Sequence, residues 1–406
     1  MDPLRHVKPA VRAVRAYTLA ERDAPVKINQ NENPWDLPES LKRRVLAAAL
    51  ARPWSRYPAF DPRELALALA AFSGWRADGI LAGNGSNEMI EALLVVTVGA
   101  GTRVVIPEPT FTLYALLTTI LGGEAVRVML RKAGRLSSGR PAAASLSSFE
   151  PGSRSPDPDG PPDPSDSPDA SGPFVYDIDA LLEARRASGA PLTIVCSPNN
   201  PTGTSLSLAD VERLCGDGDG LVVIDEAYHE FAGASVVPLL ARHPNLVVLR
   251  TFSKAMGLAG LRVGYLLASP ELVREVNKAR LPYNVNFFSQ LAALAALEER
   301  ETLAGNVRRL VEGRERLLAR LGDVPGVRAH ASDANFFLLE LLKADAKAVF
   351  DAMARRGVLV RDVTAYPLLA RCLRVSVGSD EENDAFLHAL GTALAEAGAY
   401  VETGRA

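Results

Sequence analysis

Short apolar runs alternate with longer amphipathic stretches from about residue 80 onward. The short runs are rich in β-branched residues and indicate buried strands, whereas the apolar positions between or around them recur at helical spacing. Continuous apolar strands are typical of a mostly parallel sheet that helices cover on both faces, so we predict a large α/β domain. Its predicted strands are 103–107, 192–198, 221–225, 245–250 and 262–269, and its predicted helices lie near 86–98, 110–121, 207–215 and 270–280.

A second pattern begins after this domain. A long amphipathic stretch covers 287–321, and strand-like runs follow at 334–341, 357–362 and 372–377, with helical patterns between and after them. This order predicts a smaller α+β domain. The expected division is an N-terminal segment (1–45) that folds back over the small domain, a large domain (46–285) and the small domain itself (286–406).

One segment inside the large domain breaks the alternation. Residues 150–173 are almost wholly Pro, Asp, Ser and Gly, with Ala170 as their only hydrophobic residue. They cannot bury enough apolar surface to offset the entropy lost on ordering, so disorder is predicted. The serine-rich residues before them extend this insertion to 137–173. A tolerated surface insertion and an acidic loop that binds a partner are both open.

Composition narrows the class of protein. The 406 residues are 48% hydrophobic, and a net charge of −3 gives no electrostatic reason to expect nucleic acid or an anionic membrane as a partner. The N-terminus carries a charge every few residues, which is not typical of a secretory signal, and no apolar stretch reaches membrane-spanning length. The three cysteines and five histidines show no disulfide framework and no metal-ligand spacing. We expect a cytoplasmic protein without a metal.

Candidate chemistry first appears where the strand 245–250 ends. Lys254 follows this strand, and Arg262 comes later in the same motif, "SKAMGLAGLRVG". Ligands of open α/β folds bind at the carboxyl ends of the strands, and a guanidinium suits bidentate binding of a phosphate. A simple strand-to-helix turn with a solvated lysine would look the same, so the motif alone does not decide between the two.

Three further motifs favour a ligand site. In "GNGSNEMIEALL", Gly85, Ser86 and Asn87 stand at a predicted helix start, which can bind an anion or merely cap the helix. In "SPNNPTG" (197–203), an asparagine amide can donate to a ligand, or the motif is a plain Asn-Pro turn. Asp225 ends an apolar strand, where a buried carboxylate needs a cation. With the lysine and the arginine, these are the parts that a pyridoxal phosphate site requires.

Taken with these parts, nearly the whole chain apart from the insertion resembles the fold-type I, aspartate-aminotransferase-like enzymes, and in particular the histidinol-phosphate aminotransferase family. The resemblance implies that family's fold, an aminotransferase activity in histidine biosynthesis, pyridoxal 5′-phosphate as the cofactor, and a homodimer. The motifs that carry it are "NENP" (31–34), "RYP" (56–58), "PEPTFTLY" (107–114), "SPNNPTG", "DEAY" (225–228), "TFSKAMGLAGLRVGY" (251–265) and "CLRVSVG" (372–378).

The same resemblance assigns roles around the cofactor. Lys254 would be the Schiff-base lysine, Asp225 the partner of the pyridine nitrogen and Tyr228 a ligand of the ring oxygen, and these three form the expected catalytic set. Further cofactor contacts are implied for Asn200 at the ring oxygen, for Ser253, Arg262, Gly85, Ser86 and Asn87 at the phosphate, for Phe111 stacked on the ring, and for Tyr57 reaching the neighbouring subunit's cofactor.

The substrate side rests on two arginines. The resemblance gives Arg374 the carboxylate of an amino donor, and Arg361 ends the preceding strand-like run. If the two runs are neighbours, both guanidiniums can bind one phosphate dianion; the alternative is that Arg361 pairs with Asp362 or another surface acid. Tyr17 and Asn33 complete the expected set. We therefore expect L-histidinol phosphate as the donor and 2-oxoglutarate as the acceptor.

Three rival functions share these motifs. They are an aromatic amino-acid aminotransferase, a phosphothreonine-type decarboxylase on the same scaffold, and a non-catalytic module of a regulator. The last is disfavoured because Lys254 is present and the chain shows no DNA-binding appendage.

Overall fold

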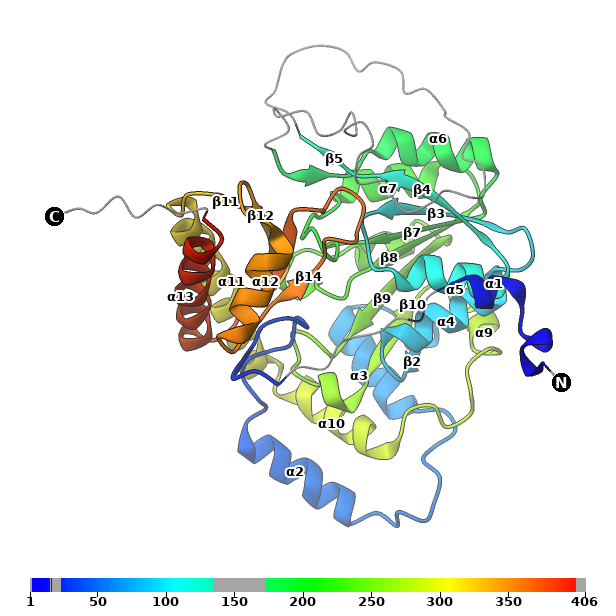
Figure 1. Ribbon diagram of the computed structural model, residues 1–406. Coiled ribbons are helices and arrows are strands. Elements are labelled where there is room, and N and C mark those ends of the chain that lie inside the picture. Colours follow the sequence, from blue (N-terminus) through cyan, green and yellow to red (C-terminus); the bar gives the residue numbers. More distant parts are fainter. Residues whose placement is uncertain (1, 15, 17–22, 134–171, 399–406) are drawn as a thin grey trace.

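The computed structural model describes residues 2–14, 16, 23–133 and 172–398 (Figure 1). Its largest element is a seven-stranded sheet in the order β2-β10-β9-β8-β7-β3-β4. Neighbouring strands are parallel except at β10, which is antiparallel to both β2 and β9. The predicted α/β fold with a mostly parallel sheet is confirmed. The strands are β2 (Ile80–Gly83), β3 (Arg103–Glu108), β4 (Glu124–Met129), β7 (Leu192–Cys196), β8 (Leu221–Asp225), β9 (Leu246–Thr251) and β10 (Gly264–Leu267).

Helices cover both faces of this sheet, which explains why its central strands are apolar throughout. Successive strand residues point to opposite faces, so Val222 and Ile224 of β8 enter one core and Val223 enters the other. The first core is closed by α2 (Glu39–Leu50), α3 (Arg63–Ser73), α6 (Ile178–Ser188), α7 (Leu208–Gly216) and α10 (Phe287–Glu298), and the second by α4 (Ser86–Thr97), α5 (Leu113–Leu121) and α9 (Pro270–Val276).

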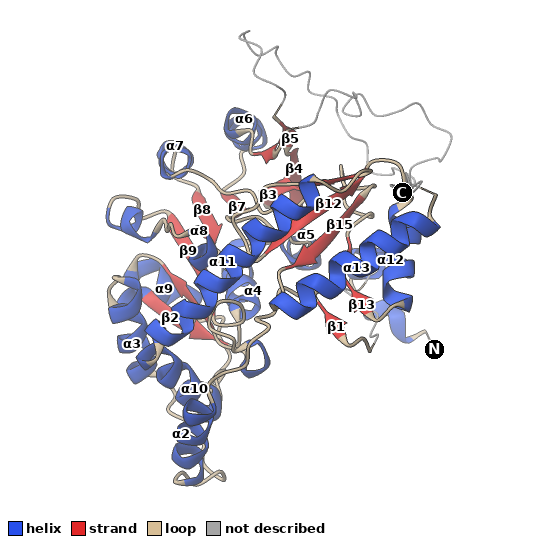
Figure 2. Cartoon of the chain, turned by 90° about the vertical axis from the view of Figure 1, so that its left-hand side faces the viewer, coloured by secondary structure: helices blue, strands red, loops and turns tan. Residues whose placement is uncertain are grey.

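A separate four-stranded antiparallel sheet, in the order β11-β12-β15-β14, lies beside the large one (Figure 2). Its strands are β11 (Val327–Ala329), β12 (Phe336–Leu341), β14 (Arg361–Asp362) and β15 (Cys372–Ser376). Its core also takes in side chains of α11 (Arg300–Gly322), α12 (Ala346–Arg355) and α13 (Asp380–Glu396). Ala227, Tyr228 and Ala255, which follow β8 and β9, belong to this core too, so the two sheets meet where those strands end.

Part of the N-terminal segment, at residues 26–27, lies on the smaller sheet's side of the molecule, whereas residues 9–13 contact α5 beside the large sheet. On the smaller sheet's side, β1 (Val26–Lys27) pairs in parallel with β13 (Val358–Leu359). The other described elements before β1 are a short 3-10 helix (Pro3–His6) and α1 (Pro9–Ala13), and α8 (His229–Ala232) follows β8. None of the helices in the described ranges is long and apolar enough to cross a membrane.

Two predicted elements divide where the sequence showed no break. The stretch 287–321 forms two helices, because α10 ends at Glu298 and Glu299 leaves helical geometry before α11 begins. The run 357–362 forms β13 and β14, which belong to two different sheets. Within the two larger sheets, the strands β2, β4 and β11 were not predicted. Of these, β4 is an edge strand that is only partly buried, so its apolar pattern is weak.

The predicted insertion leaves the fold at a hairpin. Strands β5 (Arg131–Lys132) and β6 (Phe174–Val175) pair antiparallel, and Ala133 N donates to Pro173 O at 2.8 Å. Residues 134–171, which include nearly all of the insertion, lie outside the described residues. The two strands that flank the insertion therefore pair with each other, so the insertion begins and ends at neighbouring points of the fold.

Candidate active site

A cavity of about 240 Å³ lies at the carboxyl ends of β7, β8 and β9, where the two sheets meet. This is the position at which open α/β sheets bind ligands. Most residues that the sequence analysis selected line it. They are Ser86, Asn87, Phe111, Asn200, Asp225, Tyr228, Ser253, Lys254, Arg262, Arg361 and Arg374.

Asp225, the last residue of β8, is a buried carboxylate in this cavity. Its Oδ2 accepts from Tyr114 Oη at 2.7 Å and its Oδ1 from Ala227 N at 3.0 Å. Burial raises the pKa of Asp225 to about 6 against the opposing effect of these two hydrogen bonds. Among the described residues no cationic side chain forms an ion pair with it. A cationic group of a ligand would satisfy this carboxylate.

Lys254 stands on the turn after β9. Its Nζ donates to Gln30 O at 2.8 Å. Burial lowers the pKa of Lys254 to about 8, and the positive charges of Arg374 and Arg262 act in the same direction. Near neutral pH a larger share of this lysine is therefore the free amine, the form that attacks a carbonyl.

An anion cradle faces the lysine. Ser86 opens α4, whose free N–H groups carry the positive end of the helix dipole. Arg262 Nη1 donates to Ser253 Oγ at 3.2 Å, which brings the guanidinium and a hydroxyl together. Gly85 has φ +82°, and a Cβ there would lie 2.5 Å from Arg262 Nη2. Glycine thus lets the arginine close over the turn, and the set fits a phosphate.

Asn200 and Tyr228 lie between this cradle and the smaller sheet. Arg374 Nη1 donates to Asn200 Oδ1 at 2.6 Å, so the amide nitrogen of Asn200 is the atom that can donate to a ligand. Tyr228 Oη accepts from Asn31 Nδ2 at 3.0 Å. Burial raises the pKa of Tyr228 well above its ordinary value, which keeps the hydroxyl protonated.

The two predicted arginines are direct neighbours. Arg361 of β14 is the cross-strand partner of Arg374 of β15, and both line the cavity. Asp362 instead accepts from Thr364 N at 2.9 Å and Thr364 Oγ1 at 2.7 Å, so its alternative pairing with Arg361 does not form. Like charges that face each other across two strands are unfavourable without a counter-ion. This pair is suited to an anionic ligand.

Besides Gly85, whose turn lies against Arg262, three selected residues are not among the described residues that line the cavity. Tyr57 has 80% of its surface exposed and stacks on Tyr283, with ring centroids 4.4 Å apart. Asn33 lines a neighbouring cavity that shares Ser253 with this one, and its Oδ1 accepts from Trp35 N at 3.1 Å within its own turn. Tyr17 lies outside the described residues.

The cavity also contains residues that the sequence analysis did not select. Tyr114 holds Asp225, Asn31 holds Tyr228, and Tyr366 lines the wall from the loop between β14 and β15. Tyr114 and Asn31 stand in the quoted motifs "PEPTFTLY" and "NENP", which was the available signal. No sequence signal pointed to Tyr366, because the sequence does not distinguish a single tyrosine in a loop from a tyrosine on the surface.

Comparisons with known proteins agree with this chemistry. A family model described as aminotransferase class I and II matches residues 24–138 and 168–390. The chain is 36% identical over 386 residues to the histidinol-phosphate aminotransferase of Chlorobaculum tepidum, covering 95% of this chain and 99% of that protein. It is 34% identical over 391 residues to that of Chlorobium phaeovibrioides, covering 96% and 97%.

Solved structures show the same fold. The histidinol-phosphate aminotransferase of Sinorhizobium meliloti, in complex with pyridoxal-5′-phosphate, superposes with a TM-score of 0.77 at 24% identity over 96% of this chain and 98% of its own. L-threonine-O-3-phosphate decarboxylase of Porphyromonas gingivalis gives 0.70 at 22% identity, over 91% and 99%. At these identities the likeness shows the fold alone.

Proposed function

The chain belongs to the class I and II aminotransferases, within them to the histidinol-phosphate aminotransferase family, and we propose that it transfers the amino group of L-histidinol phosphate to 2-oxoglutarate. The products are imidazole-acetol phosphate and L-glutamate, and the step belongs to histidine biosynthesis. The observation that carries the substrate assignment is the facing pair Arg361 and Arg374 in the wall of the cavity that also holds Lys254 and Asp225.

Pyridoxal 5′-phosphate is the cofactor, and it supplies the electron sink for bond breaking at the substrate Cα when bound. The cavity's donor set fits it. Lys254 is the residue for its covalent attachment, and Asp225, buried without a cationic partner among the described residues, is placed to hold a protonated pyridine nitrogen. Around them, Asn200 and Tyr228 would donate to the ring oxygen, Phe111 would pack on the ring, and Ser253, Arg262, Ser86, Asn87 and the Gly85 turn would hold the phosphate.

Lys254 is also the proposed proton carrier. An amine with a pKa of about 8 is near the optimum for accepting and returning a proton close to neutral pH. Lys254 lines the cavity, so its amine could reach a group bound there. Tyr228 would donate to the ring oxygen of the bound cofactor, and Asn31 Nδ2, which donates to Tyr228 Oη, would fix the direction of the phenol.

Arg361 and Arg374 explain how one site can accept both substrates. The phosphate of histidinol phosphate and the distal carboxylate of 2-oxoglutarate are both anions that a guanidinium fork binds with two hydrogen bonds. Arg374 is held by Asn29 O at 2.6 Å as well as by Asn200, so its position is set before a substrate arrives. Tyr17 is proposed as a further hydroxyl donor to the phosphate.

A cytoplasmic homodimer is part of the proposal. Several large apolar side chains are exposed together along the segment from the end of α2 to α3 and in the turn that contains Tyr283. They are Leu50, Trp54, Tyr57, Phe60 and Leu281. Contiguous exposed apolar surface of this kind marks an interaction site. A second copy seated here would bury these side chains and carry Tyr57 to the partner's cofactor phosphate.

The test compares three amino donors with the purified enzyme loaded with pyridoxal phosphate. Histidinol phosphate with 2-oxoglutarate should give glutamate with a higher kcat/KM than phenylalanine does. O-phospho-L-threonine should release no carbon dioxide. More efficient turnover of phenylalanine would favour an aromatic aminotransferase, and carbon dioxide from phosphothreonine would favour the decarboxylase.

A further inference from the structure

A buried ion pair between Glu226 and Arg250 lies beside the cavity, at the ends of β8 and β9. Glu226 directly follows Asp225, the last residue of β8, but unlike Asp225 it does not line the cavity. Its carboxylate meets Arg250 of β9, whose Nη2 and Nε lie 2.9 and 3.0 Å from Glu226 Oε2. Only 6% of the Arg250 side chain and 2% of the Glu226 side chain are exposed.

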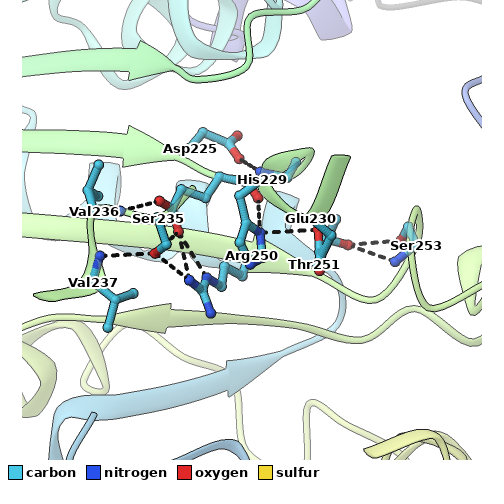
Figure 3. Close-up of polar contacts among 11 residues, drawn as sticks. Asp225, His229, Glu230, Ser235, Val236, Val237, Arg250, Thr251 and Ser253 are labelled. Atoms are coloured by element: carbon cyan, nitrogen blue, oxygen red, sulfur yellow. Dashed lines mark hydrogen bonds and ion pairs between the residues drawn. The ribbon is translucent and has the colours of Figure 1, made fainter. Parts of the chain in front are cut away.

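The pair is satisfied by a third segment, the turn that contains Ser235 and Val236. Glu226 Oε1 accepts from Val236 N at 2.6 Å, and Oε2 accepts from Ser235 Oγ at 3.0 Å. Arg250 Nη2 donates to Ser235 Oγ at 2.6 Å, as Figure 3 shows. A buried pair whose hydrogen bonds are all made has one favoured geometry, and removal of one partner leaves a buried charge without compensation.

The ion pair is connected by short backbone segments to both Asp225 and Lys254. Glu226 N donates to Leu249 O at 2.8 Å, so β8 and β9 remain paired one residue beyond Asp225. On β9, Arg250 is followed by Thr251, whose Oγ1 accepts from Ser253 N at 3.1 Å and thereby shapes the turn that presents Lys254. The side chains of Asp225 and Lys254 thus stand on two strand ends that the ion pair joins.

We propose that Glu226 and Arg250 are positioning residues, which hold the ends of β8 and β9 at the spacing that lets Asp225 and Lys254 engage the same cofactor. The proposal rests on the proposed function in so far as the bound group is pyridoxal phosphate. Neither side chain touches the cofactor or the substrate. Their effect therefore belongs to cofactor binding and to kcat rather than to recognition of the substrate.

The test uses Arg250→Lys, which keeps the charge but loses the guanidinium fork, and Glu226→Gln, which keeps the shape but loses the charge. The holoenzyme is measured for pyridoxal phosphate Kd, for the circular dichroism of the bound cofactor in the visible range, and for kcat and KM. We expect kcat to fall about 10-fold to 100-fold, a weaker Kd and a reduced dichroic band, with KM for histidinol phosphate unchanged.

The matched control is Arg185→Lys at the opposite end of β8. Arg185 is a buried arginine of α6 that donates to Leu214 O at 2.8 Å and Gly220 O at 2.7 Å. This variant should lose thermal stability while it keeps the dichroic band and kcat. A double variant, Glu226→Gln with Arg250→Met, leaves no unpaired charge and should have a higher Tm than Arg250→Met alone, yet retain the cofactor defect.

Two results would overturn the proposal. One is a normal dichroic band, Kd and kcat in Arg250→Lys and Glu226→Gln, and the other is recovery of all three in the double variant along with its stability. Either would make the pair a purely structural contact. If the unmutated enzyme fails to use histidinol phosphate, the substrate assignment is contradicted, while Kd and the dichroic band still test the positioning role.

Discussion

The two walls of the cavity are built in different ways. The wall proposed to hold the cofactor, called the cofactor wall, is centred on the ends of β8 and β9, central strands of the seven-stranded sheet, and its residues there are close in sequence (225–228 and 251–262). The substrate wall depends on the two-residue strand β14 at an edge of the smaller sheet. Its Arg374 is held by contacts with residues 174 and 345 positions away along the chain.

We expect the cofactor wall to determine the rate of the reaction and the substrate wall to determine which substrate binds. On the cofactor wall the ionisable groups Asp225 and Lys254 have pKa values of about 6 and 8, because burial opposes charge on each of them. A well-packed sheet is needed to hold them there. On the substrate wall an edge strand can change its side chains without disturbing a core. Variants of the cofactor wall should therefore affect kcat, and variants of the substrate wall should affect KM.

The largest effect is expected from Lys254→Ala, on the cofactor wall. It should abolish turnover and also the covalent trapping of pyridoxal phosphate by borohydride, because no other amine takes its place. Mass spectrometry of the reduced protein gives the site of attachment. Lys278→Ala, in an exposed ion pair with Glu275, is the control and should be fully active. Cofactor trapped on a different lysine would contradict the whole assignment of the cofactor wall.

Asp225→Asn should produce the next largest effect. Asparagine can accept from Ala227 N through Oδ1 and can donate to Tyr114 Oη through Nδ2, but it cannot hold a proton on the pyridine nitrogen as well as a carboxylate does. We expect kcat to fall roughly 1,000-fold or more, several kcal/mol of barrier, with a smaller change in KM. Steady-state kinetics at saturating cofactor measures this. Near-normal turnover would show that Asp225 does not support the electron sink.

On the substrate wall, Arg361→Ala should raise KM for histidinol phosphate. Loss of one charge-assisted contact is worth about 1.5–3 kcal/mol, or roughly 10-fold to 100-fold in KM. The Kd for pyridoxal phosphate should not change. Arg371→Ala provides the control, since Arg371 lies on the same segment, outside the cavity lining, and donates to Leu341 O at 2.7 Å. Equal losses in both variants would mean that Arg361 supports the fold rather than the substrate.

The buried carboxylate should also leave a mark on the stability of the cofactor-free protein. The pKa of Asp225 is about 6 in the fold against an ordinary 3.8, so between these pH values the folded protein keeps a proton that the unfolded chain has released. Its stability must then fall as pH rises from about 4 to 6 and stay lower above that range. Asp225→Asn removes this dependence and should stabilise the cofactor-free protein at pH 7.5 by about 1–3 kcal/mol.

Urea unfolding at pH 4.5 and pH 7.5 measures this difference, with Asp333→Asn, an exposed carboxyl, as the control. An equal or lower stability of Asp225→Asn at pH 7.5 would show that the carboxylate is compensated in the cofactor-free protein. Together with kcat, the free energy of unfolding of Asp225→Asn tests whether a group needed for activity lowers the stability of the cofactor-free protein.

The smallest effect is expected outside both walls. Replacing residues 137–171 with a short Gly/Ser linker should leave kcat, KM and Tm nearly unchanged. The family model leaves out 139–167, and β5 and β6 bring the two ends of the segment together. Shortening a loop changes its closure entropy by only about 0.6 kcal/mol per halving of its length. A large loss of activity or Tm would indicate a function of the insertion beyond the aminotransferase fold.

The class of fold and most residues of the cofactor wall could be predicted from the sequence alone. Apolar runs of strand length, spaced by helical periods, were sufficient to predict the α/β sheet, because burial on both faces leaves a continuous hydrophobic signal. The residues 225–228 and 251–262 could be selected because the chain places reactive side chains directly after such runs. For these residues local pattern and final position coincide.

Only the tertiary structure decided the rest. It placed Arg361 opposite Arg374, gave Asp225 its Tyr114 partner, and divided 357–362 between two sheets. It also revealed that Glu226 and Arg250 form a buried pair. Each of these facts depends on which segments pack together, and strand register across tens or hundreds of residues is set by the total burial and hydrogen bonding of the folded chain, which no local stretch encodes.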